Sequence, residues 1–452
     1  MYNSSLQREE IERVYGRISP FELKDKLINL AEDSRRGSAH SLLDAGRGNP
    51  NWIAATPREA FFTFGQFAVS ESRRVWDEGD LAGMPRKEGI AVRFRDYVKN
   101  HPDAPGIELL WKMINYGVTV KCFNADDWIY ELVDGIIGDN YPHPDRMLRH
   151  VELVVNDYLI QELCYNEPLE GRFNTFAVEG ATAGMCYIFD SLIANNILSK
   201  GDKIALMSPI FTPYLEIPHL PRYNFEVINI CADEMDEEGR HTWQYPESEI
   251  DKLKDASIKA LFVVNPNNPP SVAMRPQSVR QLKHVVENFN PDLMIISDDV
   301  YSTFVDNFSS IMADLPYNTI GVYSYSKYFG VTGWRLGTIA LYEDNVFDKL
   351  IREQDEDRKQ RARKRYAGLS TDPDSILFID RIVADSRQVA LNHTAGLSTP
   401  QQVQMAFFSL FAIVDKDDRY KKLTNDICRR RKKLLFDGLC IDIKEDPYDA
   451  AY

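Results

Sequence analysis

From about residue 170 onward, short apolar runs bounded by turn residues alternate with stretches of helical periodicity. This alternation narrows the choice of fold, because it is the pattern of βαβ units on a mostly parallel sheet flanked by helices. We therefore predict the α/β class. The runs expected to be strands are 204–207 (IALM), 260–264 (ALFVV), 293–297 (LMIIS), 319–324 (TIGVYS) and 337–342 (GTIALY).

The chain is long enough for more than one domain, since a single core stops growing at about 250 to 300 residues. We expect residues 61–345 to form the large domain, and 1–60 to form an arm and part of a small domain. We expect residues 346–452 to supply the C-terminal small domain and this domain to be incomplete. Residues 350–435 have the pattern of long amphipathic helices. A further helix should begin at Pro276 and cover the sheet.

Charge and cysteine usage limit the function classes. With 53 basic and 68 acidic residues the net charge is −15, which argues against nucleic acid or an anionic membrane as a partner and favours small molecules. The six cysteines show neither a CxxC pair nor zinc spacing, so we expect reduced thiols, a cytoplasmic location and no metal site. No apolar run approaches the roughly 18 residues that a membrane span needs.

Three polar residues follow three of the expected strands. Asn268 comes after 260–264, Asp298 after 293–297 and Lys327 after 319–324, at intervals of 30 and 29 residues. Each interval is about one βα repeat, which places the three side chains at the carboxyl edge of one sheet, where open α/β folds bind ligands.

A lysine, an aspartate and an asparagine together suit pyridoxal phosphate. The lysine amine forms a Schiff base, the aspartate holds the pyridine nitrogen protonated, and donors such as Asn268 and Tyr301 fix the ring oxygen. The protonated ring then withdraws electrons from the substrate carbon. We expect Lys327, Asp298 and Tyr301 to be catalytic.

The cofactor's phosphate needs its own binding site. The run GATAGM, with Gly180, Ala181 and Thr182, follows the apolar TFAV and opens a helical stretch, so its backbone N–H groups would face an anion. Ser324 and Arg335 could complete this site. Phe211, in the run SPIFTPY, is the candidate for stacking on the cofactor ring.

Each of these residues has an ordinary explanation when it is taken singly. A lone lysine in an apolar stretch more often snorkels to the surface, an aspartate after a strand more often caps a helix, and NPNNPP is more often a simple turn. Phe211 is as well explained as a core side chain. The joint spacing favours the site over these separate explanations.

The motifs NPNNPP, SDDVY and SYSKYFGVTGWRLG carry a resemblance to a known family. Over residues 40 to 430 the chain resembles the fold type I pyridoxal phosphate enzymes of the aspartate aminotransferase superfamily. The resemblance implies the roles just described, with Lys327 as anchor and base and Ser324 and Arg335 on the phosphate. It also implies that Tyr141 reaches the phosphate of a neighbouring subunit, hence a homodimer or higher homo-oligomer; a polar surface tyrosine is the alternative.

One departure points to a branch of that superfamily. Aminotransferases usually have N-P-T-G where this chain has NPPS, residues 268–271. With DAGRGNPNW, the long segment 98–140 and LNHTAGLSTPQQVQMA, this is similar to the aspartate 4-decarboxylases, which convert L-aspartate to L-alanine and carbon dioxide. The candidate substrate contacts are Arg47, Gly48, Asn268 and Thr394.

The superfamily holds the substrate α-carboxylate with an arginine of the C-terminal small domain, which we do not find here. Arg429, Arg430 and Arg431 form a basic run expected to face solvent, as is the cluster 358–365. Three functions stay open: a β-decarboxylase with some aminotransferase activity, an aminotransferase for acidic or aromatic amino acids that needs a keto acid, and an inactive scaffold that still binds the cofactor.

Overall fold

The chain forms two compact units, Met1–Pro50 and Asn51–Tyr452. In this computed structural model the described residues are 13, 18, 20–35, 48–79, 81–139, 146–165, 170–387, 396–442 and 446–452. In the first unit, helix α2 spans Pro20–Arg35. All other elements of the residues described above belong to the second unit, and the division into a large and a small domain stays a prediction.

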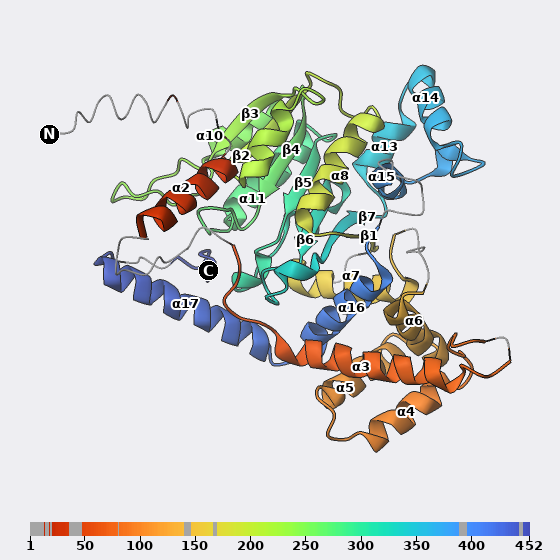
Figure 1. Ribbon diagram of the computed structural model, residues 1–452. Coiled ribbons are helices and arrows are strands. Elements are labelled where there is room, and N and C mark those ends of the chain that lie inside the picture. The colour runs from red at the N-terminus through yellow and green to blue at the C-terminus, as the bar shows by residue number, and fades with distance from the viewer. Residues whose placement is uncertain are drawn as a thin grey trace. The chain divides into compact units, whose positions relative to one another are not determined.

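A mixed sheet lies at the centre of the second unit (Figure 1). In the part of the chain that the structure describes, it has seven strands in the order β1-β7-β6-β5-β4-β2-β3. Strand β7 runs antiparallel to both of its neighbours, and the other paired strands are parallel. The strands are β1 (Phe173–Val178), β2 (Lys203–Ser208), β3 (Glu226–Cys231), β4 (Ile258–Val264), β5 (Met294–Asp298), β6 (Thr319–Ser324) and β7 (Gly337–Tyr342).

All five predicted strands are confirmed, as β2, β4, β5, β6 and β7. Two strands, β1 and β3, were not predicted because neither has the sequence pattern of a continuous apolar run. Strand β1 carries polar residues inside a fully buried strand, at Asn174 and Thr175. Strand β3 is at the edge of the sheet and is partly exposed, so its sequence EVINIC lacks a clean apolar run.

The helices of the second unit cover both faces of the sheet or pack in a separate layer (Figure 1). They are α3 (Ala55–Arg74), α4 (Ile90–Asn100), α5 (Ile107–Thr119), α6 (Ala125–Ile137), α7 (Arg149–Leu163), α8 (Ala181–Ala194), α9 (Thr212–Glu216), α10 (Glu247–Ile250), α11 (Pro276–Asn288), α12 (Ile311–Asp314), α13 (Val346–Arg352), α14 (Glu356–Tyr366), α15 (Phe378–Ser386), α16 (Thr399–Val414) and α17 (Arg419–Leu439).

Strand β4 shows how the two faces are filled. Because side chains alternate across a strand, Ala260, Phe262 and Val264 join one apolar cluster, which also contains side chains of α8. Leu261 and Val263 point the other way, into the cluster with α11. Both faces are buried, which explains why the strand is a continuous apolar run.

Helix α11 confirms the prediction made from Pro276, which occupies its first turn. Its buried residues Leu282, Val285 and Val286 face the sheet. The region predicted as long helices, 350–435, contains α14 to α17. Helices α16 and α17, with 16 and 21 residues, confirm the prediction, whereas α14 and α15 have only 11 and 9 residues.

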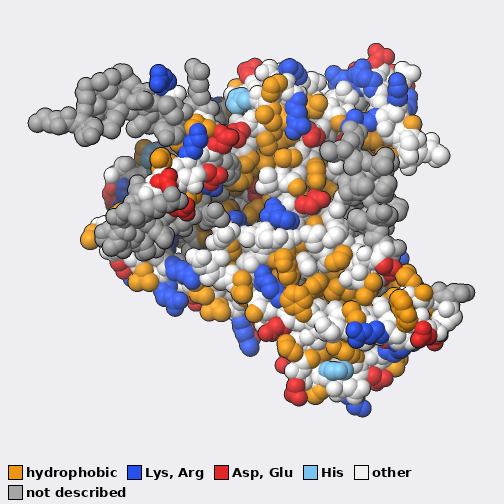
Figure 2. All heavy atoms as spheres, in the orientation of Figure 1, with side chains coloured by type: hydrophobic (Ala, Val, Ile, Leu, Met, Phe, Trp, Pro, Cys, Tyr) orange, Lys and Arg blue, Asp and Glu red, His pale blue; other side chains and the backbone are white. Residues whose placement is uncertain are grey.

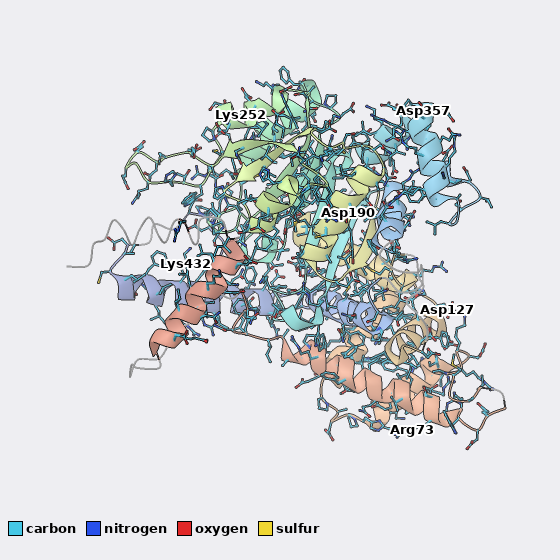
Figure 3. The ribbon with its side chains drawn as sticks, turned by 45° about the horizontal axis from the view of Figure 1, so that its top comes forward. Arg73, Asp127, Asp190, Lys252, Asp357 and Lys432 are labelled. Carbon is cyan, nitrogen blue, oxygen red and sulfur yellow. The ribbon has the colours of Figure 1, made fainter. Side chains whose placement is uncertain are left out.

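Helices α3, α5, α6, α7 and α16 pack on one another beside the sheet (Figure 1). Arg73 at the end of α3 and Asp127 on α6 are both in this layer (Figure 3). Its core includes the buried Phe64 and Trp128. Among the helices of the described residues, none is long and apolar enough to cross a membrane.

Candidate functional site

Three neighbouring parallel strands bring the predicted polar residues to one edge. Asp298 is the last residue of β5, and it pairs in register with Val264 of β4 and with Val322 of β6. Lys327 follows the end of β6, and Asn268 follows the end of β4. Neighbouring strands are about 4.8 Å apart, so the ends of the three strands that carry these residues span about 10 Å of the sheet edge. The spacing argument is therefore confirmed at the level of the sheet.

Asp298 is a buried carboxylate with neutral donors. The Tyr214 hydroxyl donates to its Oδ2 at 3.1 Å, and the backbone N–H of Val300 lies 3.3 Å from its Oδ1. Burial raises the pKa of Asp298 to about 6, and these two hydrogen bonds oppose the rise. A cationic N–H next to this carboxylate would lower its pKa again, so the position suits a protonated ring nitrogen.

Tyr214 was missed in the sequence analysis. It lies on α9, three residues after Phe211, and its side chain is fully buried. A tyrosine in an apolar run is usually a core residue, so the signal was weak. Only the packing of α9 against the sheet brings its hydroxyl to Asp298.

A second carboxylate, Asp299, is buried beside the first. The hydroxyls of Ser310 and Ser297 donate to it at 2.7 and 2.9 Å. Burial is the main cause that raises the pKa of Asp299 to about 7, and the charge of Asp298 adds to it. Asp299 holds the turn after β5 in place, since its own N–H also donates to the Val322 carbonyl.

Lys327 is half-buried at the end of β6. Its pKa is lowered, first because burial disfavours the charged amine and second because Arg335 is a nearby cation. The amine therefore becomes neutral at a lower pH than that of an ordinary lysine. A neutral amine is what a nucleophile or a general base requires.

Next to Lys327 along the edge of the sheet, the backbone at Gly180 lies close to the side chain of Arg335. Gly180, before α8, has φ +89°, and a Cβ added there would lie 2.4 Å from Nη2 of Arg335. A Cβ added to Gly337 would lie 2.7 Å from the backbone of Gly180. The Arg335 Nη2 donates to the Glu179 carbonyl at 3.3 Å. Contact between β7 and the start of α8 thus requires glycine at position 337, whereas a Cβ at position 180 would meet the end of the Arg335 side chain.

This arrangement depends on the direction of β7. Because β7 is antiparallel to β1 and β6, its first residue, Gly337, pairs with Val178 and with Ser324. The residues just before β7 therefore lie at the carboxyl edge. Among them, Arg335, two residues before Gly337, lies beside the N–H groups that open α8. A helix N-terminus and a guanidinium together favour an anion such as a phosphate.

Other predicted phosphate contacts lie at the same strand ends. Ser324 is buried, and its Oγ lies 2.9 Å from that of Ser326 and 3.1 Å from the Leu336 carbonyl. Ala181 and Thr182 are the first two residues of α8, and Thr182 is exposed.

The predicted ring contacts are also partly accessible. Phe211 lies before α9 and packs, partly buried, against the apolar cluster on the α8 face. Tyr301 follows β5, and burial together with Asp298 raises its pKa to about 12. Asn268 is half-buried in the loop after β4.

Four predicted residues are not placed in this arrangement. Arg47, Tyr141 and Thr394 lie outside the described residues. Gly48 is described and exposed, but it belongs to the unit Met1–Pro50. Their predicted contacts with substrate or phosphate stay predictions.

Both basic clusters of the sequence contain arginines that pair with carboxylates. Arg363 pairs with Asp374 at 2.7 Å, and Arg365 pairs with Asp385 at 3.0 Å. Arg429 is exposed and pairs with Asp306 at 2.7 Å. Among the described residues, no group of three or more His, Cys, Asp or Glu residues could hold a metal ion.

Comparison with known proteins identifies the family. Over 97% of this chain and 82% of the relative, the sequence is 46% identical to a bifunctional aspartate aminotransferase and L-aspartate beta-decarboxylase of a Pseudomonas species. The chain belongs to the family of that enzyme. The model of aminotransferase classes I and II matches residues 181–356 of this family member, a range that contains Asp298, Lys327 and Arg335.

More distant relatives of this aspartate β-decarboxylase family share the fold. An aspartate aminotransferase of Pyrococcus horikoshii is 26% identical over 50% of this chain and 55% of its own length. A solved aspartate aminotransferase double mutant of Thermus thermophilus has a TM-score of 0.54 at 15% identity, over 92% of this chain and 76% of that chain. The aspartate aminotransferase of Rhizobium meliloti gives the same TM-score at 14% identity, over 94% of this chain and 74% of its own. The predicted fold type I is thus confirmed, and aminotransferases of these classes use pyridoxal 5'-phosphate.

Proposed function

We propose that this protein is a pyridoxal phosphate-dependent enzyme that removes the β-carboxylate of L-aspartate and releases L-alanine and carbon dioxide, with aminotransferase activity as a side reaction. The observation that carries the proposal is the edge on which Lys327, Asp298 and Arg335 converge, in a chain 46% identical to a bifunctional aspartate aminotransferase and L-aspartate beta-decarboxylase.

The residues at the edge fit the cofactor. Because Gly180 has no side chain, its backbone lies next to the Arg335 guanidinium. Backbone N–H groups and a guanidinium side by side suit a phosphate. Two strands along the sheet from β7, at the end of β5, the buried Asp298 has neutral donors and suits a cationic ring nitrogen. Lys327 follows β6, the strand between β7 and β5.

The proposed roles follow from these positions. Bound pyridoxal phosphate supplies an electron sink for negative charge that develops at the substrate carbon. The Lys327 amine is the attachment point, and once it is released it takes the Cα proton as a base, for which its lowered pKa prepares it. Asp298 holds the positive charge of the ring nitrogen, and Tyr214 orients Asp298.

The remaining roles concern orientation. Asn268 and Tyr301 donate to the ring oxygen, and Phe211 packs against the ring. Ser324, with Gly180, Ala181 and Thr182 at the start of α8, binds the phosphate together with the guanidinium described above.

For the substrate, we propose contacts from Arg47, Gly48, Asn268 and Thr394. The β-carboxylate must be oriented without a strong ion pair throughout, because stabilising the carboxylate in the ground state opposes its loss. The arginine for the α-carboxylate is unassigned.

The test supplies L-aspartate labelled at the 4-carboxyl carbon to the purified protein with pyridoxal phosphate and without keto acid. Labelled carbon dioxide and alanine should form in equal amounts over many turnovers. The matched variant Lys327→Ala should release neither product. Cofactor binding without any carbon dioxide would contradict the decarboxylase.

The second candidate is an aminotransferase, favoured by the similarity to a relative named as a bifunctional aspartate aminotransferase and L-aspartate beta-decarboxylase. It would consume aspartate only when a keto acid such as 2-oxoglutarate is added. The ratio of alanine formed without keto acid to amino acid formed with it separates the two activities.

A homodimer or larger assembly in the cytoplasm belongs to the same proposal. Phe62 and Val69 on α3 and Trp76 just after it are 57, 42 and 66% exposed, and hydrophobic side chains are visible on the surface around this helix (Figure 2). Apolar exposure of this kind suits a subunit interface. The six cysteines are unpaired, as in reducing compartments.

A further inference from the structure

The segment Asp446–Tyr452 adds a short antiparallel pairing to the loop after β4. The backbone N–H of Ala273 donates to the Tyr448 carbonyl, and the N–H of Ala450 donates to the Ser271 carbonyl, both at 2.8 Å. Between these bonds, Val272 and Asp449 form a β-bridge. The loop paired in this way is the one that carries Asn268.

The last residue of this segment reaches the other predicted ring-oxygen donor. The ring of Tyr452 stacks on that of Tyr301, with centroids 4.3 Å apart and planes at 17°. The Tyr452 hydroxyl donates to the Asn267 carbonyl at 3.3 Å, next to Asn268. One tyrosine therefore contacts both places from which the ring-oxygen donors come.

Neighbouring contacts fix the segment on either side. The N–H of Ala451 donates to the Phe304 carbonyl at 2.8 Å, in the turn that begins at Tyr301. Arg275 pairs with Asp446 at 2.9 Å. Lys432 of α17, labelled in Figure 3, lies 3.7 Å from Asp449. The segment is thus held by the loop, by the turn after β5 and by α17.

We propose that Tyr452 is a positioning residue of the cofactor site: its ring holds the Tyr301 phenol in the orientation that donates to the cofactor's ring oxygen, so that docking of Asp446–Tyr452 sets the proton affinity of the bound cofactor. The inference rests on the proposed function. Its physical basis is the face-to-face contact, which blocks rotation of the Tyr301 ring away from the site.

The effect is measured on the cofactor's visible absorbance, which changes with protonation of its bond to Lys327. A phenol that donates to the ring oxygen favours the deprotonated form of that bond, so loss of the donor raises the midpoint of the pH titration. Tyr301→Phe should raise this midpoint by about one pH unit, as expected for one hydrogen bond to a charged oxygen.

Tyr452→Ala should raise the midpoint in the same direction, by about half a unit to one unit. The double variant Tyr301→Phe with Tyr452→Ala should match Tyr301→Phe alone, because both changes act through one hydroxyl. Tyr452→Phe keeps the stacked ring and should restore the wild-type midpoint. Tyr452→Leu fills the space without a flat ring and should behave as alanine does.

Tyr448→Ala is the matched control. This tyrosine lies in the same segment, but its side chain lines a different pocket, with Cys164 and Met274. Its loss should lower the melting temperature and leave the midpoint unchanged. An unchanged midpoint in Tyr452→Ala, or a shift in the double variant equal to the sum of the single shifts, would overturn the inference.

Failure of the proposed function gives a different result. In that case the wild-type protein would show no visible band that depends on Lys327, whichever residue stands at position 452. A wild-type band that titrates normally, with no response to Tyr452→Ala or Tyr452→Leu, would reject the positioning role alone.

Discussion

Replacing Gly180 by alanine tests the proposed phosphate site at its closest contact. The new Cβ would lie 2.4 Å from Nη2 of Arg335, far inside contact distance. Nη2 is the end of a long, flexible side chain, so the guanidinium should move rather than the sheet. The substitution therefore displaces the guanidinium from the start of α8 while residue 335 itself stays an arginine.

The backbone strain of the substitution needs a control. Gly201 has φ +87°, nearly the φ +89° of Gly180, and nothing lies within 4 Å of a Cβ added there. Each alanine should cost about 1 to 3 kcal/mol in the free energy of unfolding, because a side chain disfavours positive φ. Only Gly180→Ala should also weaken cofactor binding.

The size of the binding loss follows from the contact that is removed. Hydrogen bonds to a charged group contribute about 1.5 to 3 kcal/mol. The dissociation constant of pyridoxal phosphate should therefore rise roughly 10- to 150-fold in Gly180→Ala. Gly201→Ala should keep the wild-type value.

The assay is an absorbance titration of each apo protein with pyridoxal phosphate, beside urea unfolding of the same samples. Arg335→Gln and the double variant with Gly180→Ala complete a thermodynamic cycle. If alanine acts through the guanidinium, the double variant binds no more weakly than Arg335→Gln. Additive losses, or wild-type affinity in Gly180→Ala, would refute the reasoning.

Three further predictions concern buried groups and strain. Tyr214→Phe removes a donor that lowers the pKa of Asp298, so the acid limb of the kcat/KM profile should move up by about one pH unit; an unmoved limb would separate Tyr214 from the site. Asp299 has its pKa raised to about 7, so the apo protein binds a proton there that the unfolded chain, with a pKa near 4, has already lost. Stability should thus fall between pH 4 and 7 by on the order of 1 kcal/mol per pH unit, and urea unfolding of Asp299→Asn should show that slope reduced rather than retained. Ser271 has φ +63°, so Ser271→Gly should raise the free energy of unfolding by up to about 1 kcal/mol, and a decrease would contradict strain in that loop.

Local patterns in the sequence were sufficient for most of the sheet and for one edge of the site. The five apolar runs and the regular interval between Asn268, Asp298 and Lys327 place those residues on adjacent strands, since parallel βαβ units repeat. The Arg335 position was predicted from a motif, whereas its physical reason, the antiparallel direction of β7, came from the structure.

Contacts made over long sequence separation could not be predicted. Tyr214 meets Asp298 across 84 residues, and its own surroundings give only a core pattern. The pairing of Val272 with Asp449 joins a loop to a segment that has little strand character of its own. In both cases tertiary packing, rather than local preference, selects the partner.

The same long separations bear on how the protein is made. Glu179 and Arg335 lie 156 residues apart in the chain, and β1 can pair only after β7 has been synthesised. During translation, the segment 173–178 therefore leaves the ribosome long before its partner strand exists. Until then its apolar side chains stay exposed to solvent unless another protein covers them. The edge proposed to bind the phosphate is complete only when β7 is in place, so capture of a phosphate-bearing cofactor would be a late event that reports the arrival of this strand.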